Sequence, residues 1–476
     1  MRDHGAPASS SQFIAHEIQA FRDHIRSLRV APTVSSADIR RRLESYTFAQ
    51  QVPLTDALRD VAGMLRDWTL HAAHPRYFGL FVPGVHEAGI WADALAALYN
   101  PQLGAWWHAP AANEIEIHTL KFLAEVIGFE ATAAHFTTGG SEANLTALLA
   151  AIATAYPNAP EDGVGEGAER GAVYVSSQAH HSMQKAVRIA GLGNRVLRII
   201  PCNAHHQMDI AALRETVGVD VAAGRKPIMI VGTVGTTTAG AIDDLGAIGK
   251  VARANSAWFH VDAAWGGAAG FSAHLRPHLH GINAADSVTW DAHKWLSVPM
   301  GAGMFFCRRP DVLRAIFDVE AAYVPKEQDE GNDPYLMSLQ WSRRFIGLKV
   351  FLTLAVVGRD GVAARIEQQL CVADYLRHRL TSAGWATVNQ SPLPLICFTH
   401  PALKSSEAIA GVAQHIALGG RAWISAATLP EGPVLRACIT HDDTSLADVD
   451  VLCEELNRAL GSSSSSRPVA VGPSQA

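Results

Sequence analysis

The chain has 476 residues, 48% of them hydrophobic, which is enough to bury the core of one large domain with smaller attachments. Its 39 Lys+Arg and 45 Asp+Glu give a formal net charge of -6 without long like-charged runs, which argues against nucleic acid or an anionic membrane as a partner. The six cysteines are scattered without a CxxC pair, so we expect neither a disulfide framework nor a metal site, and a reducing, cytoplasmic location. The N-terminus is polar, so we expect no targeting segment. The longest apolar tract, near residues 147–155, is too short to span a membrane.

The first part of the chain predicts amphipathic helices between residues 12 and 74. Leu54, Leu58, Val61 and Leu65 recur three or four residues apart, as one face of a helix requires. These helices have no evident partner within a single chain. We therefore expect them to pack against another surface.

The central part alternates helical tracts with short, almost wholly apolar runs. Such runs, bounded by glycine, proline and polar residues, are typical of strands in a sheet covered on both faces. The runs are GAVYVSS, VLRIIP, PIMIVGTVG, AWFHVDAA, SVTWD and GAGMFFCR. The pattern predicts an α/β domain.

After a predicted helical stretch from about Leu339 to Ala383, three further strand-like runs alternate with helices. They are ATVNQSPLPLICFTH, AWISAATL and PVLRACIT, and they predict a smaller α+β domain with antiparallel strands. We expect an N-terminal helical segment (1–82), a large α/β domain (83–350), a small C-terminal α+β domain (351–460) and a disordered tail (461–476).

The stretch HFTTGGSEANLTALL predicts an apolar turn, two glycines and the start of a helix. Gly139 and Gly140 would let a ligand approach the backbone closely. Ser141 could add a hydroxyl, and the free amides of the first helical turn favour an anion such as phosphate. The alternative is an ordinary helix cap.

Asp262 follows the apolar strand WFHVD and precedes small residues. A carboxylate in such a place is costly to bury unless it is paired with a cation or hydrogen-bonded. An arginine or a helix N-terminus would serve as a structural partner. A protonated heterocyclic nitrogen would serve as a functional one.

Lys294, in SVTWDAHKWL, lies among apolar residues and 32 residues beyond Asp262. It could extend along an apolar surface with its ammonium in water, or partial burial could make its amine a nucleophile toward an aldehyde. An anion cradle, a strand-end aspartate and this lysine together match the phosphate, ring nitrogen and aldehyde of pyridoxal phosphate.

At this point the sequence resembles a known family, the group II pyridoxal-phosphate-dependent amino acid decarboxylases of fold type I. The resemblance runs from about His74 to Arg436 and depends on six motifs in order. They are HPRYFG, TTGGSEANL, QAHHS, GTTTAGAID, HVDAAWGG and DAHKW. It implies a large domain with a mostly parallel sheet of seven strands covered by helices, and a small C-terminal domain.

The resemblance also implies roles for individual residues. Lys294 would form the aldimine with the cofactor, and Asp262 would pair with its ring nitrogen. The phosphate would be held by Gly140, Ser141 and His293, with Asp291 near it, where relatives often have asparagine. His180 would stack on the ring, and Thr237 and Ala264 would line the cofactor.

In the family, a tyrosine 29 residues beyond the reactive lysine reprotonates the substrate carbon, which here indicates Tyr323. Tyr335 is the alternative. The implied reaction is decarboxylation through a quinonoid intermediate, giving an amine and carbon dioxide. An aminotransferase, a carbon-carbon lyase, an aldehyde-forming relative and a non-enzymatic cofactor-binding relative remain alternatives.

For the substrate we expect an aromatic L-amino acid, with glutamate, aspartate or a sulfinate kept open. The residues that the resemblance brings near the pocket are Phe81, Trp106, Trp107, His108 and Arg436. Core or dimer-interface packing would equally explain the aromatic ones, and a surface ion pair would explain Arg436. The N-terminal helices would pack across a homodimer with shared active sites.

Overall fold

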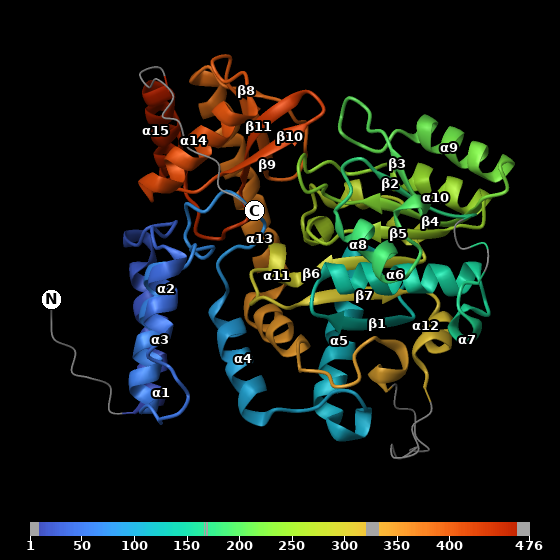
Figure 1. The fold of residues 1–476 in the computed structure, drawn as a ribbon, viewed down its shortest axis with the longest axis horizontal. Coiled ribbons are helices and arrows are strands. Elements are labelled where there is room, and N and C mark those ends of the chain that lie inside the picture. The colour runs from blue at the N-terminus through green and yellow to red at the C-terminus, as the bar shows by residue number, and fades with distance from the viewer. Residues whose placement is uncertain (1–8, 166, 168–169, 320–332, 464–476) are drawn as a thin grey trace.

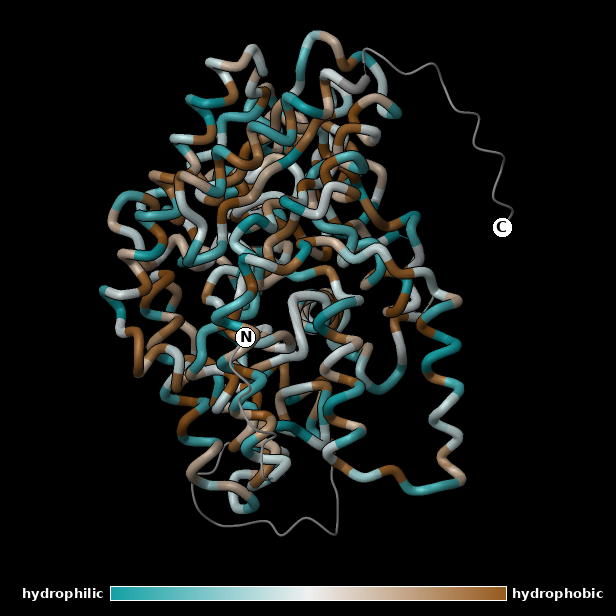
Figure 2. The backbone as a smooth tube through the Cα atoms, turned by 90° about the vertical axis from the view of Figure 1, so that its left-hand side faces the viewer, coloured by the Kyte–Doolittle hydropathy of each residue, from teal (hydrophilic) through white to brown (hydrophobic). Residues whose placement is uncertain are grey.

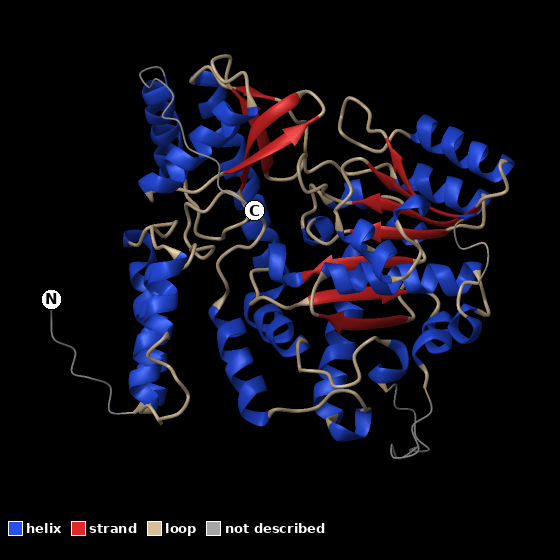
Figure 3. Cartoon of the chain, viewed as in Figure 1, coloured by secondary structure: helices blue, strands red, loops and turns tan. Residues whose placement is uncertain are grey.

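The computed structural model describes residues 9–165, 167, 170–319 and 333–463 of the chain. Figure 1 shows its helices and strands in chain order, and Figure 3 separates the two kinds of element by colour. The helices are α1 (Ser10–His24), α2 (Ser36–Leu43), α3 (Leu54–Trp68), α4 (Glu87–Tyr99), α5 (Pro110–Ile127), α6 (Gly140–Ala155), α7 (Ala159–Asp162), α8 (Ser182–Ile189), α9 (Ile210–Ala222), α10 (Leu245–Ala254), α11 (Ala292–Trp295), α12 (Pro310–Phe317), α13 (Gly347–Ser382), α14 (Ser406–Gly419) and α15 (Leu446–Ser463). The strands are β1 (Ala133–Thr137), β2 (Gly171–Ser176), β3 (Leu197–Ile200), β4 (Lys226–Thr233), β5 (Trp258–Asp262), β6 (Ser287–Asp291), β7 (Gly303–Cys307), β8 (Ala386–Thr387), β9 (Leu395–Thr399), β10 (Ser425–Leu429) and β11 (Gly432–Cys438).

The large sheet has seven strands in the order β1-β7-β6-β5-β4-β2-β3. Neighbouring strands from β6 to β3 are parallel, whereas β7 is antiparallel to both β6 and β1. This confirms the expected α/β domain and its mostly parallel sheet. Because β7 runs against both of its neighbours, β1 points the same way as the parallel strands, and its carboxyl end lies at the same edge of the sheet.

All six apolar runs of the central part form strands, β2 to β7. The expectation of a turn ahead of Gly139 was wrong, because residues 133–137 form the edge strand β1, which pairs with Gly303–Cys307. The run is short and carries two polar side chains, so its strand character comes mainly from this distant pairing.

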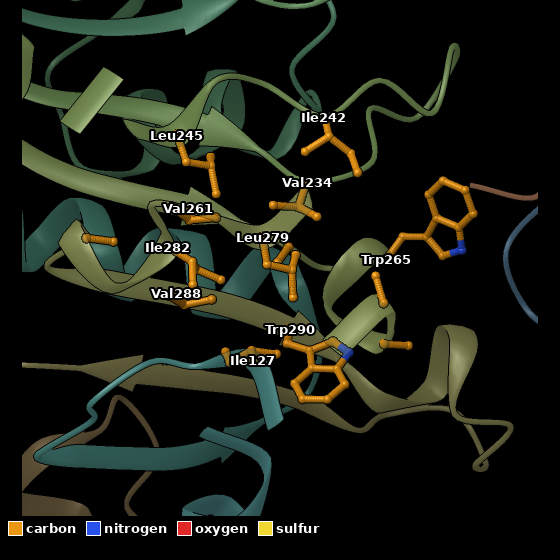
Figure 4. Packing of buried hydrophobic residues seen from close by; sticks show 14 of the residues in the cluster. Ile127, Val234, Ile242, Leu245, Val261, Trp265, Leu279, Ile282, Val288 and Trp290 are labelled. Atoms are coloured by element: carbon orange, nitrogen blue, oxygen red, sulfur yellow. The ribbon is translucent and has the colours of Figure 1, made fainter. Parts of the chain in front are cut away.

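Both faces of the large sheet are buried, which explains why its strands read as continuous apolar runs. Along β5, Trp258 packs into the cluster under α6 and α8, whereas Phe259 and Val261 pack into the cluster on the opposite face. Figure 4 shows part of the second cluster, in which Val261, Val288 and Trp290 lie against Ile127 and Leu279. Figure 2 shows the apolar segments distributed through the lower and the upper parts of the molecule.

The small sheet has the order β10-β11-β9-β8 and is antiparallel throughout. It packs with α14, α15 and the end of α13 around its own apolar cluster. This confirms the expected antiparallel C-terminal strands. The boundaries proposed between domains remain predictions, and α13 spans the one near residue 350.

The long helix begins at Gly347, eight residues later than expected, and its backbone is interrupted at Gly358 by a left-handed conformation. Buried contacts of the preceding residues explain the later start: Arg343 lies 3.5 Å from Glu116, and the Gly347 N–H donates to the same glutamate. The last helix reaches Ser463, and the rest of the predicted tail lies outside the described residues.

The N-terminal helices α1 to α3 stand at the left edge of Figure 1, beside α4 and below the small sheet. Helices α2 and α3 contain no buried residue. On α3, Leu54 and Leu65 are 64% and 60% exposed, so the described residues leave an apolar face of this helix uncovered. None of the described helices has the length and apolar character that crossing a bilayer requires.

Candidate active site

The carboxyl ends of the parallel strands bring the predicted residues to one edge of the large sheet. Asp262 ends β5 and Asp291 ends the neighbouring β6. The glycine turn before α6 follows β1, and His180 follows β2. Ligands of open α/β sheets bind at this edge.

Lys294 lies on the short helix α11, directly after β6. Its Nζ lies 3.1 Å from the Asp291 Oδ2, and its side chain is 22% exposed while that of Asp291 is buried. The other oxygen of Asp291 has no hydrogen-bond partner among the described residues. The lysine amine therefore contacts one carboxylate, on a side chain that stays partly exposed.

Asp262 is 5% exposed, yet both of its carboxylate oxygens are satisfied. The Ala264 N–H donates to Oδ1 at 3.1 Å, and the Asn144 side-chain amide donates to Oδ2 at 2.9 Å. Neutral donors hold this carboxylate, so the burial cost of its charge is met without a cation. A cationic ligand group would be its natural further partner.

The glycine turn lies against both strand ends. A Cβ added at Gly140 would lie 2.8 Å from the Asp291 Oδ2 and 3.3 Å from the Ala264 Cβ, so only glycine fits there. Ser141 lies in the first turn of α6, whose amides face the same edge, and it lines a groove of about 330 Å³ together with Thr138 and Ser182.

Two histidines lie close to these groups. His293 accepts the Ala302 N–H at Nδ1, and its Nε2 lies 3.8 Å from the Asp291 Oδ2. Desolvation lowers the pKa of His293 despite that carboxylate. Desolvation lowers the pKa of His180, although its side chain stays accessible to solvent. The charge of Asp262 acts in the opposite direction, and that of Lys294 lowers the pKa further. Both rings are therefore favoured as neutral groups.

Thr237 and Ala264 occupy different positions at this edge. Ala264 lies between Asp262 and Gly140, as its contacts with both show. Thr237 is exposed at the tip of the tight turn after β4, which Thr236 closes by accepting the Ala241 N–H. It is one strand away from Asp262.

Phe81 and Arg436 meet beside the site. The ring of Phe81 lies 4.4 Å from that of Trp265, which stacks on Trp295, the neighbour of Lys294. The Arg436 guanidinium lies 4.5 Å over the Phe81 ring and is 3% exposed. It donates to the Gly79 carbonyl, while its Nε and Nη2 have no partner among the described residues.

Trp106, Trp107 and His108 form a short 3-10 helix whose contacts lie elsewhere in this chain. The Trp106 indole donates to Glu114, and its backbone N–H donates to Asp333. His108 lines a separate open cavity of about 630 Å³ formed by α4, α5 and α13. The described contacts do not bring these three residues to Lys294.

Tyr323 lies outside the described residues, so its predicted role stays a prediction. Tyr335 is described. It lies in the 3-10 helix Pro334–Met337, its N–H donates to the Gly104 carbonyl, and its ring lies 4.6 Å from that of Trp341.

Sequence reasoning missed two residues behind Asp262. Asn144 donates to it, and His260 in turn lies 3.0 Å from the Asn144 Oδ1. Asn144 lies one turn into α6. His260 lies two residues before Asp262 on β5, so these two side chains point to the same face of the sheet. The alternation of Trp258, His260 and Asp262 along the strand was the signal from which His260 could have been predicted.

The comparisons identify the family. Residues 38–400 match the family model described as the pyridoxal-dependent decarboxylase conserved domain. The chain is 28% identical over 439 residues to an aromatic-L-amino-acid decarboxylase of Bacillus atrophaeus, covering 90% of each chain. It is 29% identical over 365 residues to the acidic amino acid decarboxylase GADL1 of Homo sapiens, covering 74% of this chain and 68% of the relative.

A solved structure of TDC from Oryza sativa, with PLP and tryptamine, has the same fold. Its TM-score is 0.89 at 24% identity, covering 96% of this chain and 99% of the other. The chain belongs to the pyridoxal-dependent decarboxylase family. It is a pyridoxal-phosphate-dependent amino acid decarboxylase, a carboxy-lyase, as the sequence motifs predicted.

The residues at the sheet edge fit this cofactor. Gly140 leaves room that any Cβ would fill, beside the amides at the start of α6, as a phosphate requires. The donor set adds a buried carboxylate at Asp262 and an accessible amine at Lys294, which suit a ring nitrogen and an aldehyde.

Proposed function

We propose that this chain decarboxylates an aromatic L-amino acid at the edge where Lys294, Asp262 and Gly140 meet. The proposal depends on the observation that all three residues lie against Ala264 or Asp291. Asp262 accepts the Ala264 N–H, Lys294 contacts Asp291, and Gly140 lies so close to both that no Cβ would fit. When bound, pyridoxal phosphate supplies an aldehyde for amines and a protonated ring that accepts electrons from the bond being broken.

Lys294 would provide the amine that tethers the cofactor and that the substrate amine replaces. Its Nζ is accessible and held by a single carboxylate, Asp291. That contact orients the amine and is released when the amine reacts. His180, accessible beside Asp262 and Lys294, would pack on the cofactor ring and fix its plane.

Asp262 would hold the ring nitrogen protonated. Its two oxygens already accept hydrogen bonds from Ala264 and Asn144, so the carboxylate has a fixed orientation before any ligand binds. The amides at the start of α6 would hold the phosphate, with Gly140, Ser141 and His293 around it and Thr237 farther along the edge.

Tyr323 remains the proposed acid that gives a proton to the substrate carbon, by its position 29 residues after Lys294. Tyr323→Phe should cut the rate of amine formation by about 10² to 10⁴-fold, the range for a lost general acid, while cofactor affinity is kept. Tyr335→Phe is the matched variant. If it causes the larger loss, Tyr335 is the acid.

Aromatic substrates are favoured by the stack of Phe81, Trp265 and Trp295 beside the reactive lysine. A specific observation favours acidic amino acids as the second candidate. The buried Arg436 guanidinium, 4.5 Å over Phe81, has two nitrogens, Nε and Nη2, without partners among the described residues, and a substrate carboxylate would satisfy them.

A panel of amino acids decides between these substrates. Carbon dioxide and amine are measured for tryptophan, tyrosine and phenylalanine, and for glutamate, aspartate and cysteine sulfinate. Equal amounts of both products from the aromatic set support the proposal, whereas turnover confined to the acidic set replaces the substrate class. Aldehyde with peroxide, in place of amine, would mean an aldehyde-forming reaction.

We further propose a homodimer with shared active sites. Support comes from the exposed apolar side chains of α3 and α4, which include Leu65 at 60% and Leu98 at 74% exposure. In such a dimer, Trp106, Trp107 and His108 would serve the partner's site. A monomeric mass by light scattering at micromolar concentration would contradict the dimer.

We propose a cytoplasmic location. All six cysteines are described, and each is a free thiol, which suits a reducing compartment. Fractionation of cells that make the protein tests this.

A further inference from the structure

The buried side chains behind Asp262 form a line of hydrogen bonds with a single possible direction. The Trp258 Nε1 lies 2.8 Å from the Ser287 Oγ, which lies 2.8 Å from the His260 Nδ1. The His260 Nε2 lies 3.0 Å from the Asn144 Oδ1, and the Asn144 Nδ2 lies 2.9 Å from the Asp262 Oδ2. All five residues are buried.

The direction follows from the two ends of the line. An indole N–H only donates, so the Ser287 oxygen accepts and its own proton is free for the His260 Nδ1. A carboxylate only accepts, so Asn144 presents its NH₂ to Asp262 and its oxygen to His260. The His260 Nε2 must then carry the ring proton and donate it to that oxygen.

The reverse arrangement is disfavoured. Turning the Asn144 amide over would place its oxygen 2.9 Å from the Asp262 carboxylate, where two acceptors repel. The Thr289 Oγ1, 3.3 Å from the His260 Nε2, accepts from the same N–H as a second partner. Burial lowers the pKa of His260 to about 4, so the ring stays neutral near pH 7 and the line carries no charge of its own.

Asn144 also connects Asp262 to the element that carries His180. Its second amide proton goes to the Ser182 Oγ at 2.8 Å, and the Ser182 N–H in turn donates to the His180 Nδ1 at 3.2 Å. Both donors of Asn144 and its one acceptor are thus used. A displacement of the Asn144 side chain would therefore change the surroundings of the Asp262 carboxylate and of the start of α8 together.

We infer that Asn144 and His260 are positioning residues that fix the Asp262 carboxylate toward the cofactor ring nitrogen, with Ser287 setting the histidine tautomer. This inference rests on the proposed pairing of Asp262 with that nitrogen. Second partners of this kind, behind the groups that bind a ligand directly, typically change affinity by about 10- to 100-fold.

The test compares two ligands on the protein freed of cofactor. One is pyridoxal phosphate, and the other is the analogue in which a C–H replaces the ring nitrogen, so that it cannot pair with a carboxylate. Dissociation constants for both are measured by absorbance titration, and the thermal midpoint of each protein is recorded without ligand. The ratio of the two constants reports the contact with the ring nitrogen alone.

We expect the unaltered protein to bind the analogue at least about 10-fold more weakly than pyridoxal phosphate. Asn144→Leu should bring this ratio close to one by weakening only the binding of pyridoxal phosphate. Thr146→Val is the matched control, because Thr146 is buried on the same helix and its hydroxyl donates within that helix, to the Glu142 carbonyl. It should keep the original ratio.

If Asn144→Leu fails to fold, Ser287→Ala carries the test, since it removes one hydroxyl and frees the His260 tautomer. It should reduce the ratio of the two dissociation constants by about 2- to 5-fold, which is the effect expected from the loss of one neutral hydrogen bond. A ratio that stays high in Asn144→Leu overturns the inference and leaves the role of Asp262 intact. If Asn144→Leu does not fold, an unchanged ratio in Ser287→Ala has the same meaning. A ratio of one in the unaltered protein overturns both.

Discussion

The ends of β5 and β6 carry the same residue type in neighbouring positions, but their surroundings are opposite. Asp262 is held by two neutral donors, the Ala264 N–H and the Asn144 amide, with a directed line of side chains behind it. Asp291 is held by the Lys294 amine, and its Oδ1 has no partner among the described residues.

The difference indicates which half of the site is complete before a ligand arrives. The partners of Asp262 are a backbone N–H and an amide, neither of which has a reactive role in the proposed mechanism, so both hydrogen bonds can persist when a ligand binds. The partner of Asp291 is the Lys294 amine, so that contact would have to break if the amine reacts as proposed. On the proposed mechanism, the β5 side is preorganised and the β6 side changes during each turnover.

Removal of the amine gives the largest expected effect and tests the β6 side directly. Lys294→Ala should lower the rate of amine formation by at least about 10³-fold, as loss of a nucleophile does, and borohydride should no longer trap the cofactor on the protein. Lys250→Ala, on the exposed face of α10, is the matched control and should keep normal activity. Trapped label at any lysine other than Lys294 in the unaltered protein contradicts the assignment.

The two carboxylates should differ strongly when each is neutralised. Asp262→Asn leaves an amide donor facing either the Ala264 N–H or the Asn144 amide, and should weaken pyridoxal phosphate binding by about 10- to 100-fold. Asp291→Asn keeps an oxygen that can accept from the partly exposed Lys294, so its effect on affinity should stay below about 3-fold. Equal losses in the two variants, measured by absorbance titration, would remove the contrast between β5 and β6.

The sequence predicted the candidate residues that stand out locally. Asp262 ends a strongly apolar strand and Lys294 follows another, where a charged side chain is conspicuous, and the glycine turn precedes a long helix. Each of these features is visible within about ten residues. The six apolar runs likewise predicted β2 to β7, because strands buried on both faces must be apolar throughout.

What the sequence did not show depends on contacts between distant segments. Asn144 and His260 are 116 residues apart and meet only because α6 lies across β5 and β6. In its own segment Asn144 looks like an ordinary helix residue. Strand β1 was missed for the same reason, because its partner β7 lies far along the chain.

A third carboxylate extends the comparison and gives the smallest expected effect, on stability rather than activity. Asp243, after β4, is buried, and its oxygens accept the N–H groups of Met208 and Thr233. Burial nevertheless raises its pKa from 3.8 to about 6, so the folded chain binds this proton more tightly than the unfolded chain. Its stabilising contribution is therefore complete below about pH 4 and is lost as the pH rises to about 6.

Asp243→Asn removes this titration while adding an N–H that faces one of the two backbone donors, so the variant should be less stable at low pH. The unfolding free energy of the unaltered protein minus that of the variant should fall by up to about 3 kcal/mol between pH 4 and pH 7, the value of a shift of about two pKa units. Urea titrations at pH 4.5, 5.5 and 7 measure it. A constant difference would mean that burial does not raise the pKa of Asp243, and that the two backbone N–H groups suffice to keep this buried carboxylate charged.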